Sequence, residues 1–184
     1  MITERERFTR LARKDSAPRV VSSFNLFQTP PELASRVVRL CGILTGRVLE
    51  PSAGLGRLYK AIRNRNADVA VTLVEQSAEC CGELYRQMED DAATTLVQGD
   101  FLAMNAERLG LFDRIVMNPP FKMGRDIKHI VHAAGLLKPG GRLVAICAAG
   151  PRQRKRFPDL QELSAGSFKG EGTNVNAGIV VLEG

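Results

Sequence analysis

Six short apolar runs separated by helical patterns constrain the fold of this chain more than any other feature. The runs cover residues 48–50, 69–75, 94–98, 113–118, 142–148 and 177–183. Between most of them, apolar residues recur at helical spacing, over 55–66, 77–91 and 124–137. Buried strands that alternate with helices predict a mostly parallel sheet with helices on both faces. A length of 184 residues and a hydrophobic content of 44% suit one such α/β, doubly wound domain with a substantial core.

A further helix is expected before the first strand, in the segment QTPPELASRVVRLCG. We predict Thr29 as its N-cap, Pro30 at its first position and Glu32 three residues after the cap. Proline costs nothing at that position because its missing N–H would have no partner there. Gly42 is expected to end the helix, since glycine readily adopts the left-handed conformation that follows many helices.

The charge distribution indicates a polyanionic partner. The formal net charge is +6, and the cations gather in residues 1–20 and in 152–156, which read RQRKR. Such clusters favour nucleic acid, although each could also be a solvated basic surface.

Other features predict a cytoplasmic protein without a metal. No apolar run approaches the roughly 18 residues of a membrane span, and the charged N-terminus lacks the apolar middle of a secretory signal. His129 and His132 have no acidic or thiol partner close by in sequence. We expect reduced, partly buried thiols at the four cysteines, which are Cys41, Cys80, Cys81 and Cys147.

A glycine-containing turn, EPSAGLG, follows the first predicted strand. Glycines there permit positive φ and a close approach of ligand to backbone, and the turn lies at the carboxyl edge of the sheet, where ligands bind. Tyr59 stands where a dinucleotide fingerprint has its third glycine, and an acid begins the turn. Both facts disfavour a phosphate and favour a ligand with an ammonium group. The candidate cofactor residues here are Glu50, Pro51, Ser52, Ala53, Gly54 and Gly56.

The next two strands also end in candidate ligand residues. Glu75, followed by Gln76, is placed to accept hydrogen bonds from both hydroxyls of a ribose. Asp100 could accept from an adenine amino group, and Phe101 could cover the ring. Each acid alone could be a surface charge, but three adjacent strand ends together match a nucleoside that carries a cation, such as S-adenosylmethionine.

The fourth predicted strand ends in the rigid turn NPPF, which comprises Asn118, Pro119, Pro120 and Phe121. The side-chain carbonyl of Asn118 and the backbone carbonyl of Pro119 can both accept from one NH₂ group and hold it for attack on a methyl group. Acceptors that match a tetrahedral nitrogen better than a flat amine also favour the transition state. Phe121 would stack on the ring that bears the amine. The alternative is a structural Pro-Pro turn with Phe121 in the core.

These motifs together resemble the amino-methyltransferases that use S-adenosylmethionine, above all small phage- or plasmid-borne DNA adenine-N6 methyltransferases. In that family a Phe-x-Thr-Pro segment precedes the cofactor motif, and here it is Phe27, Gln28, Thr29 and Pro30. The resemblance implies S-adenosylmethionine as cofactor and a seven-stranded sheet of order 3-2-1-4-5-7-6. Strand seven would be antiparallel, and strand six would lie within 163–169.

The resemblance covers residues 24–184, expected as one methyltransferase domain after a basic arm at 1–23. We expect no separate target-recognition domain. Specificity would then come from the arm, from the loop 149–158, from a second copy of the chain or from a partner subunit. Four cations in that loop are expected to hold phosphates beside an extruded base, namely Arg152, Arg154, Lys155 and Arg156.

Several functions remain compatible with these residues. N6 of adenine in DNA is the first, and an adenine or guanine amino group of ribosomal RNA is the second. A protein-glutamine methyltransferase is a third, although such enzymes generally carry tyrosine where Phe121 stands and an extra N-terminal domain. A fourth is a cofactor-binding subunit that is inactive without a partner.

Overall fold

The computed structural model describes residues 28–172 and 175–184. The predicted arm at 1–23 and Phe27 therefore lie outside the described residues. The strands are β1 (Arg47–Pro51), β2 (Ala70–Glu75), β3 (Thr94–Gln98), β4 (Phe112–Met117), β5 (Leu137–Ala148), β6 (Gln161–Glu162) and β7 (Ala177–Glu183). The α-helices are α2 (Pro31–Leu40), α3 (Arg57–Arg65), α4 (Ala78–Gln87), α5 (Ala106–Leu109), α6 (Arg125–Ala134) and α7 (Pro151–Arg156). Short 3₁₀ helices are η1 (Phe101–Ala103), η2 (Lys122–Gly124) and η3 (Lys169–Glu171).

The strands form one seven-stranded sheet of order β3-β2-β1-β4-β5-β7-β6, so the predicted fold class and strand order are confirmed. Strands β1 to β5 are parallel, and β7 runs antiparallel to both β5 and β6. The order reverses between β1 and β4. The carboxyl ends of five parallel strands therefore meet at one edge, with the switch point in the middle.

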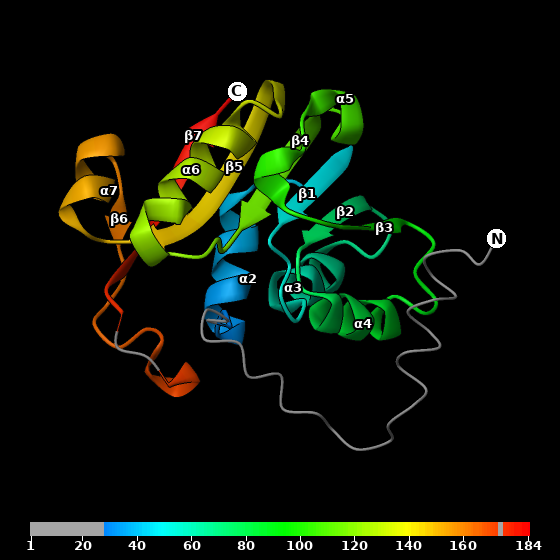
Figure 1. The fold of residues 1–184 in the computed structure, drawn as a ribbon, viewed down its shortest axis with the longest axis horizontal. Helices are drawn as coiled ribbons and strands as arrows, with labels where there is room; N and C mark the ends of the chain where they lie inside the picture. Colours follow the sequence, from blue (N-terminus) through cyan, green and yellow to red (C-terminus); the bar gives the residue numbers. More distant parts are fainter. Residues whose placement is uncertain (1–27, 173–174) are drawn as a thin grey trace.

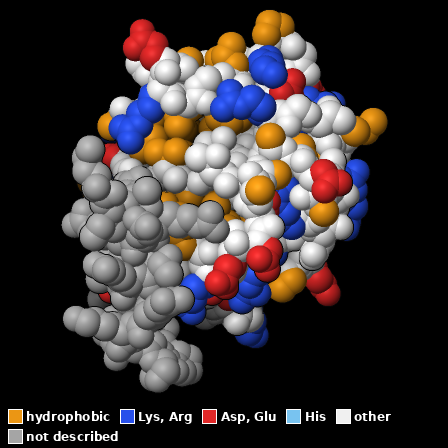
Figure 2. Space-filling model, turned by 90° about the vertical axis from the view of Figure 1, so that its right-hand side faces the viewer, with side chains coloured by type: hydrophobic (Ala, Val, Ile, Leu, Met, Phe, Trp, Pro, Cys, Tyr) orange, Lys and Arg blue, Asp and Glu red, His pale blue; other side chains and the backbone are white. Residues whose placement is uncertain are grey.

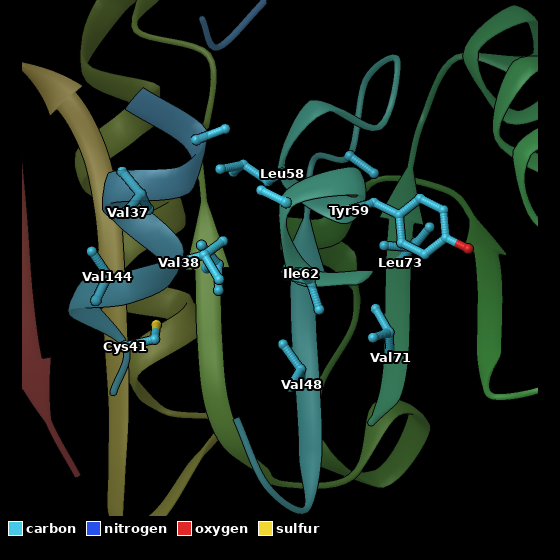
Figure 3. Packing of buried hydrophobic residues seen from close by; sticks show 14 of the residues in the cluster. Val37, Val38, Cys41, Val48, Leu58, Tyr59, Ile62, Val71, Leu73 and Val144 are labelled. Atoms are coloured by element: carbon cyan, nitrogen blue, oxygen red, sulfur yellow. The ribbon is translucent and has the colours of Figure 1, made fainter. Parts of the chain in front are cut away.

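Helices cover both faces of this sheet (Figure 1). Apolar side chains of α2, α3 and α4 pack on one face, and those of α5, α6 and η1 pack on the other. Figure 3 shows the first face: Val37 and Val38 of α2 lie over the central strands, beside Ile62 of α3 and Val48 of β1. All of these are almost fully buried. The two apolar layers hold the sheet rigid, so the loops at its carboxyl edge stand on a fixed support.

The helix before β1 begins one residue later than predicted. Pro30 is its N-cap and Pro31 its first residue. The predicted N-cap role of Thr29 is wrong, because its hydroxyl accepts a hydrogen bond from the half-buried amide of Asn118. A second proline that also suits the first helical position made this shift hard to see. Gly42 follows the helix with φ of 75°, as expected of the glycine that ends it.

Three other boundaries differ from the predictions. Strand six is the two-residue β6. Within the predicted run 163–169, residues 165–168 form turns, as glycines and serines favour, and Lys169 begins η3. Strand β5 starts at Leu137 and includes the segment KPGG, whereas the predicted strand covers only 142–148. The expected loop 149–158 contains α7, with Gly150 as N-cap and a proline at its first position.

Among the described residues, no helix is long and apolar enough to cross a bilayer. The four cysteines are free thiols and all are buried.

Candidate active site

A pocket of about 340 Å³ lies at the carboxyl edge of the sheet, where β1, β2, β3 and β4 end. That volume falls at the small end of the range for small-molecule sites. Most of the sequence-predicted site residues line it together. These are Gln28, Thr29, Glu50, Ser52, Ala53, Gly54, Glu75, Gln76, Asp100, Phe101, Asn118, Pro119 and Pro120.

The turn after β1 is fastened to the end of β2. The N–H groups of Ser52 and Ala53 both donate to the carbonyl oxygen of Val74, at 2.8 and 3.0 Å. Ser52 adopts φ of 83°, a left-handed conformation that is uncommon for a residue with a side chain. Strain of this kind concentrates at ligand sites, because the surrounding structure must hold it in place.

Glu75 joins the glycine turn to the helix that follows β2. Its Oε2 accepts from the N–H of Gly54 at 2.7 Å, and its Oε1 accepts from the N–H of Ser77 at 2.7 Å. The hydroxyl of Ser77 in turn caps α4 by accepting from Cys80. A carboxylate has about four acceptor positions. Glu75 can therefore hold the turn and still accept from the two hydroxyls of a ribose.

Glu50 is the most deeply buried acid of the pocket, with an exposed fraction of 1%. Its Oε2 has no hydrogen-bond partner among the described residues. Burial raises the pKa of Glu50 well above its usual value, and the nearby negative charge of Glu75 raises it further. A buried carboxyl oxygen that lacks a donor fits a ligand that brings an ammonium group. The acidic groups of this pocket thus suit S-adenosylmethionine, because its amino acid end carries an ammonium group.

Cofactor binding should release a proton from Glu50. In the folded protein its raised pKa keeps the proton on as pH rises past the usual value near 4.5, and an ammonium group beside it would lower that pKa again. We expect calorimetry at a series of pH values above 4.5, in two buffers of different ionisation enthalpy, to detect the released proton. The isosteric variant Glu50→Gln should release none and bind about tenfold more weakly. Equal proton release by both proteins would contradict this role.

Asn118 is oriented by the segment that precedes α2. Its Nδ2 donates to the Oγ1 of Thr29 at 3.0 Å, and Thr29 itself is only 3% exposed. This hydrogen bond sets the orientation of the amide, with its nitrogen towards Thr29. Pro119 and Pro120 line the pocket immediately beyond. The Phe-x-Thr-Pro segment and the NPPF turn, which lie far apart in the chain, are therefore in direct contact through Thr29 and Asn118.

Asp100 and Phe101 occupy the third strand end. The Oδ1 of Asp100 accepts from the N–H of Leu102 at 3.1 Å and so caps η1. The ring of Phe101 packs against His129 and His132, with centroids 5.7 and 4.9 Å apart. Both residues line the pocket, and Phe101 also belongs to the core on the α6 side of the sheet.

Four of the predicted cofactor and catalytic residues do not line the pocket: Pro30, Pro51, Gly56 and Phe121. Gly56 has a packing reason instead. It starts α3 with φ of 76°, and a Cβ there would lie 2.7 Å from the side chain of Gln87. Phe121 lies outside the pocket, and its ring meets that of the buried Phe168 edge-on at 6.5 Å.

Sequence reasoning missed Arg57, Arg125 and His129, which also line the pocket. The Nδ1 of His129 lies 3.3 Å from the hydroxyl of Ser52, and its Nε2 is buried without a partner among the described residues. Burial lowers the pKa of His129 to about 4, so the imidazole is neutral near pH 7. Its position one helical turn from His132 could not reveal this, because only the fold brings α6 beneath the turn after β1.

The basic helix α7 is anchored to α6 by a buried carboxylate. Gln153, which is 6% exposed, donates to both oxygens of Asp126 at 2.9 and 3.1 Å. The N–H of Ala148, at the end of β5, donates to the same carboxylate at 3.0 Å. Neither polar residue stood out in the sequence. Together they hold the cationic helix α7 against α6, which follows the NPPF turn.

The four cations of α7 are exposed, but two are engaged. Arg154 pairs with Glu162 at 2.9 Å, and the guanidinium of Arg156 lies 5.5 Å from the ring centre of Phe157. A nitrogen of Arg152 lies 3.9 Å from where a side chain on Gly124 would begin. By contrast, the face shown in Figure 2, on the side away from α7, mixes basic with acidic side chains. Within the described residues, no group of three or more histidine, cysteine or acidic side chains could hold a metal ion.

The strand order, the antiparallel β7 and the pocket at the switch point define a Rossmann-like methyltransferase. Residues 33–162 match the family model described as methyltransferase small domain, and the chain belongs to that family. It is therefore a methyltransferase, and its cofactor is S-adenosylmethionine.

Solved structures with this fold act on different molecules. A type I restriction-modification methyltransferase subunit from Streptococcus thermophilus is 15% identical, with a TM-score of 0.70 over 85% of this chain, which spans 44% of that protein's length. The 23S rRNA methyltransferase ErmE is 18% identical, with a TM-score of 0.67 over 86% of this chain and 69% of its own. A precorrin-6y C5,15-methyltransferase from Geobacter metallireducens is 14% identical, with a TM-score of 0.64 over 89% of this chain and 94% of its own. No curated protein matches the chain.

Proposed function

We propose that the protein methylates an exocyclic amino group of a nucleic-acid base, and that its substrate is N6 of adenine in DNA. The observation that carries this proposal is the contact between Asn118 and Thr29 at the pocket. It fixes which end of the amide is which: the donor nitrogen faces Thr29, and the carbonyl oxygen at the other end is by its chemistry an acceptor. An amide acceptor suits an NH₂ group, whereas a hydroxyl or thiol substrate would call for a base to take its proton.

In this proposal the protein positions the amine and does little proton chemistry. Asn118 and the carbonyl of Pro119 accept from the two N–H bonds of the amine, which turns the nitrogen lone pair towards the cofactor pocket. S-adenosylmethionine supplies the electrophilic methyl group when bound. The new N–C bond forms as the S–C bond breaks, and the nitrogen then loses one proton to solvent. The neutral amine is already a nucleophile, so no strong base is needed.

The basic helix supports a polyanionic substrate. It stands at the same edge as the NPPF turn, and Asp126 holds it there through Gln153. Cations fixed beside a catalytic pocket can bind the phosphates that flank a base rotated out of its stack. The similar structures include one named as a restriction-modification subunit and one named as an rRNA enzyme. Their names agree with nucleic acid as the substrate class but do not choose between DNA and RNA.

The test is a methyl-transfer assay with labelled S-adenosylmethionine and three substrates: DNA, RNA and a protein extract. We expect label in DNA, released by DNase and recovered as N6-methyladenine on nucleoside mass analysis. Label sensitive only to RNase would support the RNA alternative, and label only in protein would contradict both. Transfer that starts only when a second chain is added would identify a subunit that depends on a partner.

Arg152 and Lys155 should carry most of the phosphate contact from α7. They lie three residues apart on one face of the helix, whereas Arg154 and Arg156 are already engaged. We expect the double change Arg152→Ala and Lys155→Ala to weaken duplex DNA binding about tenfold in low salt. It should also make the plot of log K against log salt shallower by about 2, because each phosphate contact contributes about 0.9.

The matched control is Arg108→Ala. This exposed arginine lies on α5, which precedes β4 and so stands at the opposite edge of the sheet. Fluorescence anisotropy at several salt concentrations gives both quantities. An unchanged slope in the double variant, or an equal change in the control, would show that α7 is an ordinary solvated surface and does not bind DNA.

A further inference from the structure

The turn after the NPPF motif presents an apolar side chain to solvent in a strained conformation. Met123, in η2, has φ of 58° and ψ of 27°, and 83% of it is exposed. Within the described ranges only one other residue besides glycine has positive φ, and that is Ser52 in the turn of the cofactor pocket. A left-handed conformation is costly for a side chain such as methionine. Strain that persists beside a catalytic motif calls for a functional explanation.

The turn that carries Met123 is held on both sides. Pro119 and Pro120 fix the backbone before it. The N–H of Gly124 donates to the carbonyl of Phe121 at 3.3 Å, and α6 begins at the next residue. That helix is tied down through the buried carboxylate of Asp126. Met123 is thus a rigid protrusion, and its exposure is a property of the fold.

Cations surround this apolar tip. Lys122 and Arg125 are its exposed neighbours in sequence, and Arg125 also lines the cofactor pocket. Arg152 of α7 approaches the turn at Gly124. An apolar side chain framed by three cations is complementary to a partner that is apolar inside and anionic outside. Stacked base pairs between two rows of phosphates have that structure.

We propose that Met123 enters the base stack of duplex DNA and fills the space left by the adenine that rotates into the site. The inference rests on the proposed function, and it adds that the substrate is a duplex and that this side chain stabilises the extruded state. Side chains of this kind, methionine included, insert between base steps in other proteins. Extrusion costs unpairing and unstacking energy, which an inserted apolar side chain would partly offset. The lysine and arginines would hold the flanking phosphates.

The test compares Met123→Ala and Met123→Gly with the wild type on three DNA substrates. One is a duplex with the target adenine paired to thymine, one has the adenine opposite an abasic site, and one is single-stranded. Glycine suits φ of 58°, so Met123→Gly removes the side chain without adding strain. We expect both variants to lose about 10- to 100-fold in kcat/KM on the paired duplex. On the other two substrates they should stay within about threefold, because little or no extrusion energy remains to be offset.

The control variant is Ile43→Ala. Ile43 is comparably exposed, at 73%, but precedes β1 and so lies at the opposite edge of the sheet. It should leave kcat/KM unchanged on all three substrates. A 2-aminopurine at the target position should fluoresce less with the Met123 variants than with the wild type, since fewer bases are unstacked.

Equal losses on all three substrates, or no loss on the paired duplex, would overturn the role of Met123 while leaving the proposed function intact. A wild-type protein that methylates none of the three DNAs would overturn both proposals. A membrane of anionic lipids is also apolar inside and anionic outside, so binding to phosphatidylserine vesicles tests that alternative. Vesicle binding that Met123→Gly abolishes, with methylation of the paired duplex unchanged, would assign the tip to a membrane and overturn the proposal.

Discussion

Asn118→Ala is expected to lower kcat for methyl transfer about 10²- to 10³-fold while leaving the cofactor affinity within about threefold of the wild type. The variant loses the side-chain acceptor that would hold the substrate amine, and acceptors that act mainly in the transition state affect kcat most. Removal of one such preorganised group typically costs about 10²- to 10³-fold in kcat. The cofactor contacts assigned to Glu50 and Glu75 are untouched, because those residues follow other strands.

The contact with Thr29 offers a graded version of the same experiment. Thr29→Val keeps the shape but removes the hydroxyl that accepts from Asn118, so the amide loses its fixed orientation. We expect kcat to fall about tenfold, in line with one hydrogen bond, and Thr29→Ser to restore it. Single-turnover kinetics measure the effect on methyl transfer, and calorimetry with S-adenosylhomocysteine measures the effect on cofactor binding. If Asn118→Ala lost binding and turnover equally, its proposed role at the substrate would be wrong.

Glu75→Ala is expected to weaken cofactor binding about 100-fold, which corresponds to about 2.7 kcal/mol. Two losses combine in this variant. The ribose hydroxyls lose their acceptor, and the N–H groups of Gly54 and Ser77 lose the carboxylate that joins the glycine turn to α4. We expect Glu75→Gln to restore little, because its NH₂ group would face one of those N–H donors.

Glu79→Ala provides the matched control, since Glu79 is an exposed acid in the first turn of the same helix. Its affinity for S-adenosylhomocysteine should equal that of the wild type. Circular dichroism would verify that both variants are folded before their affinities are compared. A Glu75→Ala protein that is folded and binds as tightly as the wild type would exclude this carboxylate from the site.

The strand order could be predicted because its signals are local. Buried β-branched runs mark the strands, helical spacing marks the helices between them, and the family resemblance supplied the position of β7. Where local signals were ambiguous, the prediction failed. Two adjacent prolines both suit a helix start, so the N-cap was placed at Thr29 rather than at Pro30. Likewise, the turn-forming residues KPGG and the polar run RQRKR were predicted as loops, but they belong to β5 and α7.

Contacts between distant segments could not be predicted in the same way. The hydrogen bond of Thr29 with Asn118 and that of Gln153 with Asp126 join residues on different elements. The neutral His129 beneath the cofactor turn belongs to the same group. Asp126, Gln153 and His129 carry no pattern that distinguishes them from surface polar residues, and the motifs that mark Thr29 and Asn118 do not show that these two side chains are in contact. Only burial reveals that each must find a partner.

The sequence alone determined the fold class, the positions of the motifs and the chemistry of the cofactor, because strand periodicity and the residues at strand ends are local properties. The tertiary structure decided which of those residues share a pocket. It placed Phe121 and Gly56 outside the pocket, and it held α7 against α6 through Asp126 and Gln153. It also set Met123 in an exposed, strained position among cations. These outcomes depend on packing between elements far apart in the chain, which no stretch of sequence encodes by itself.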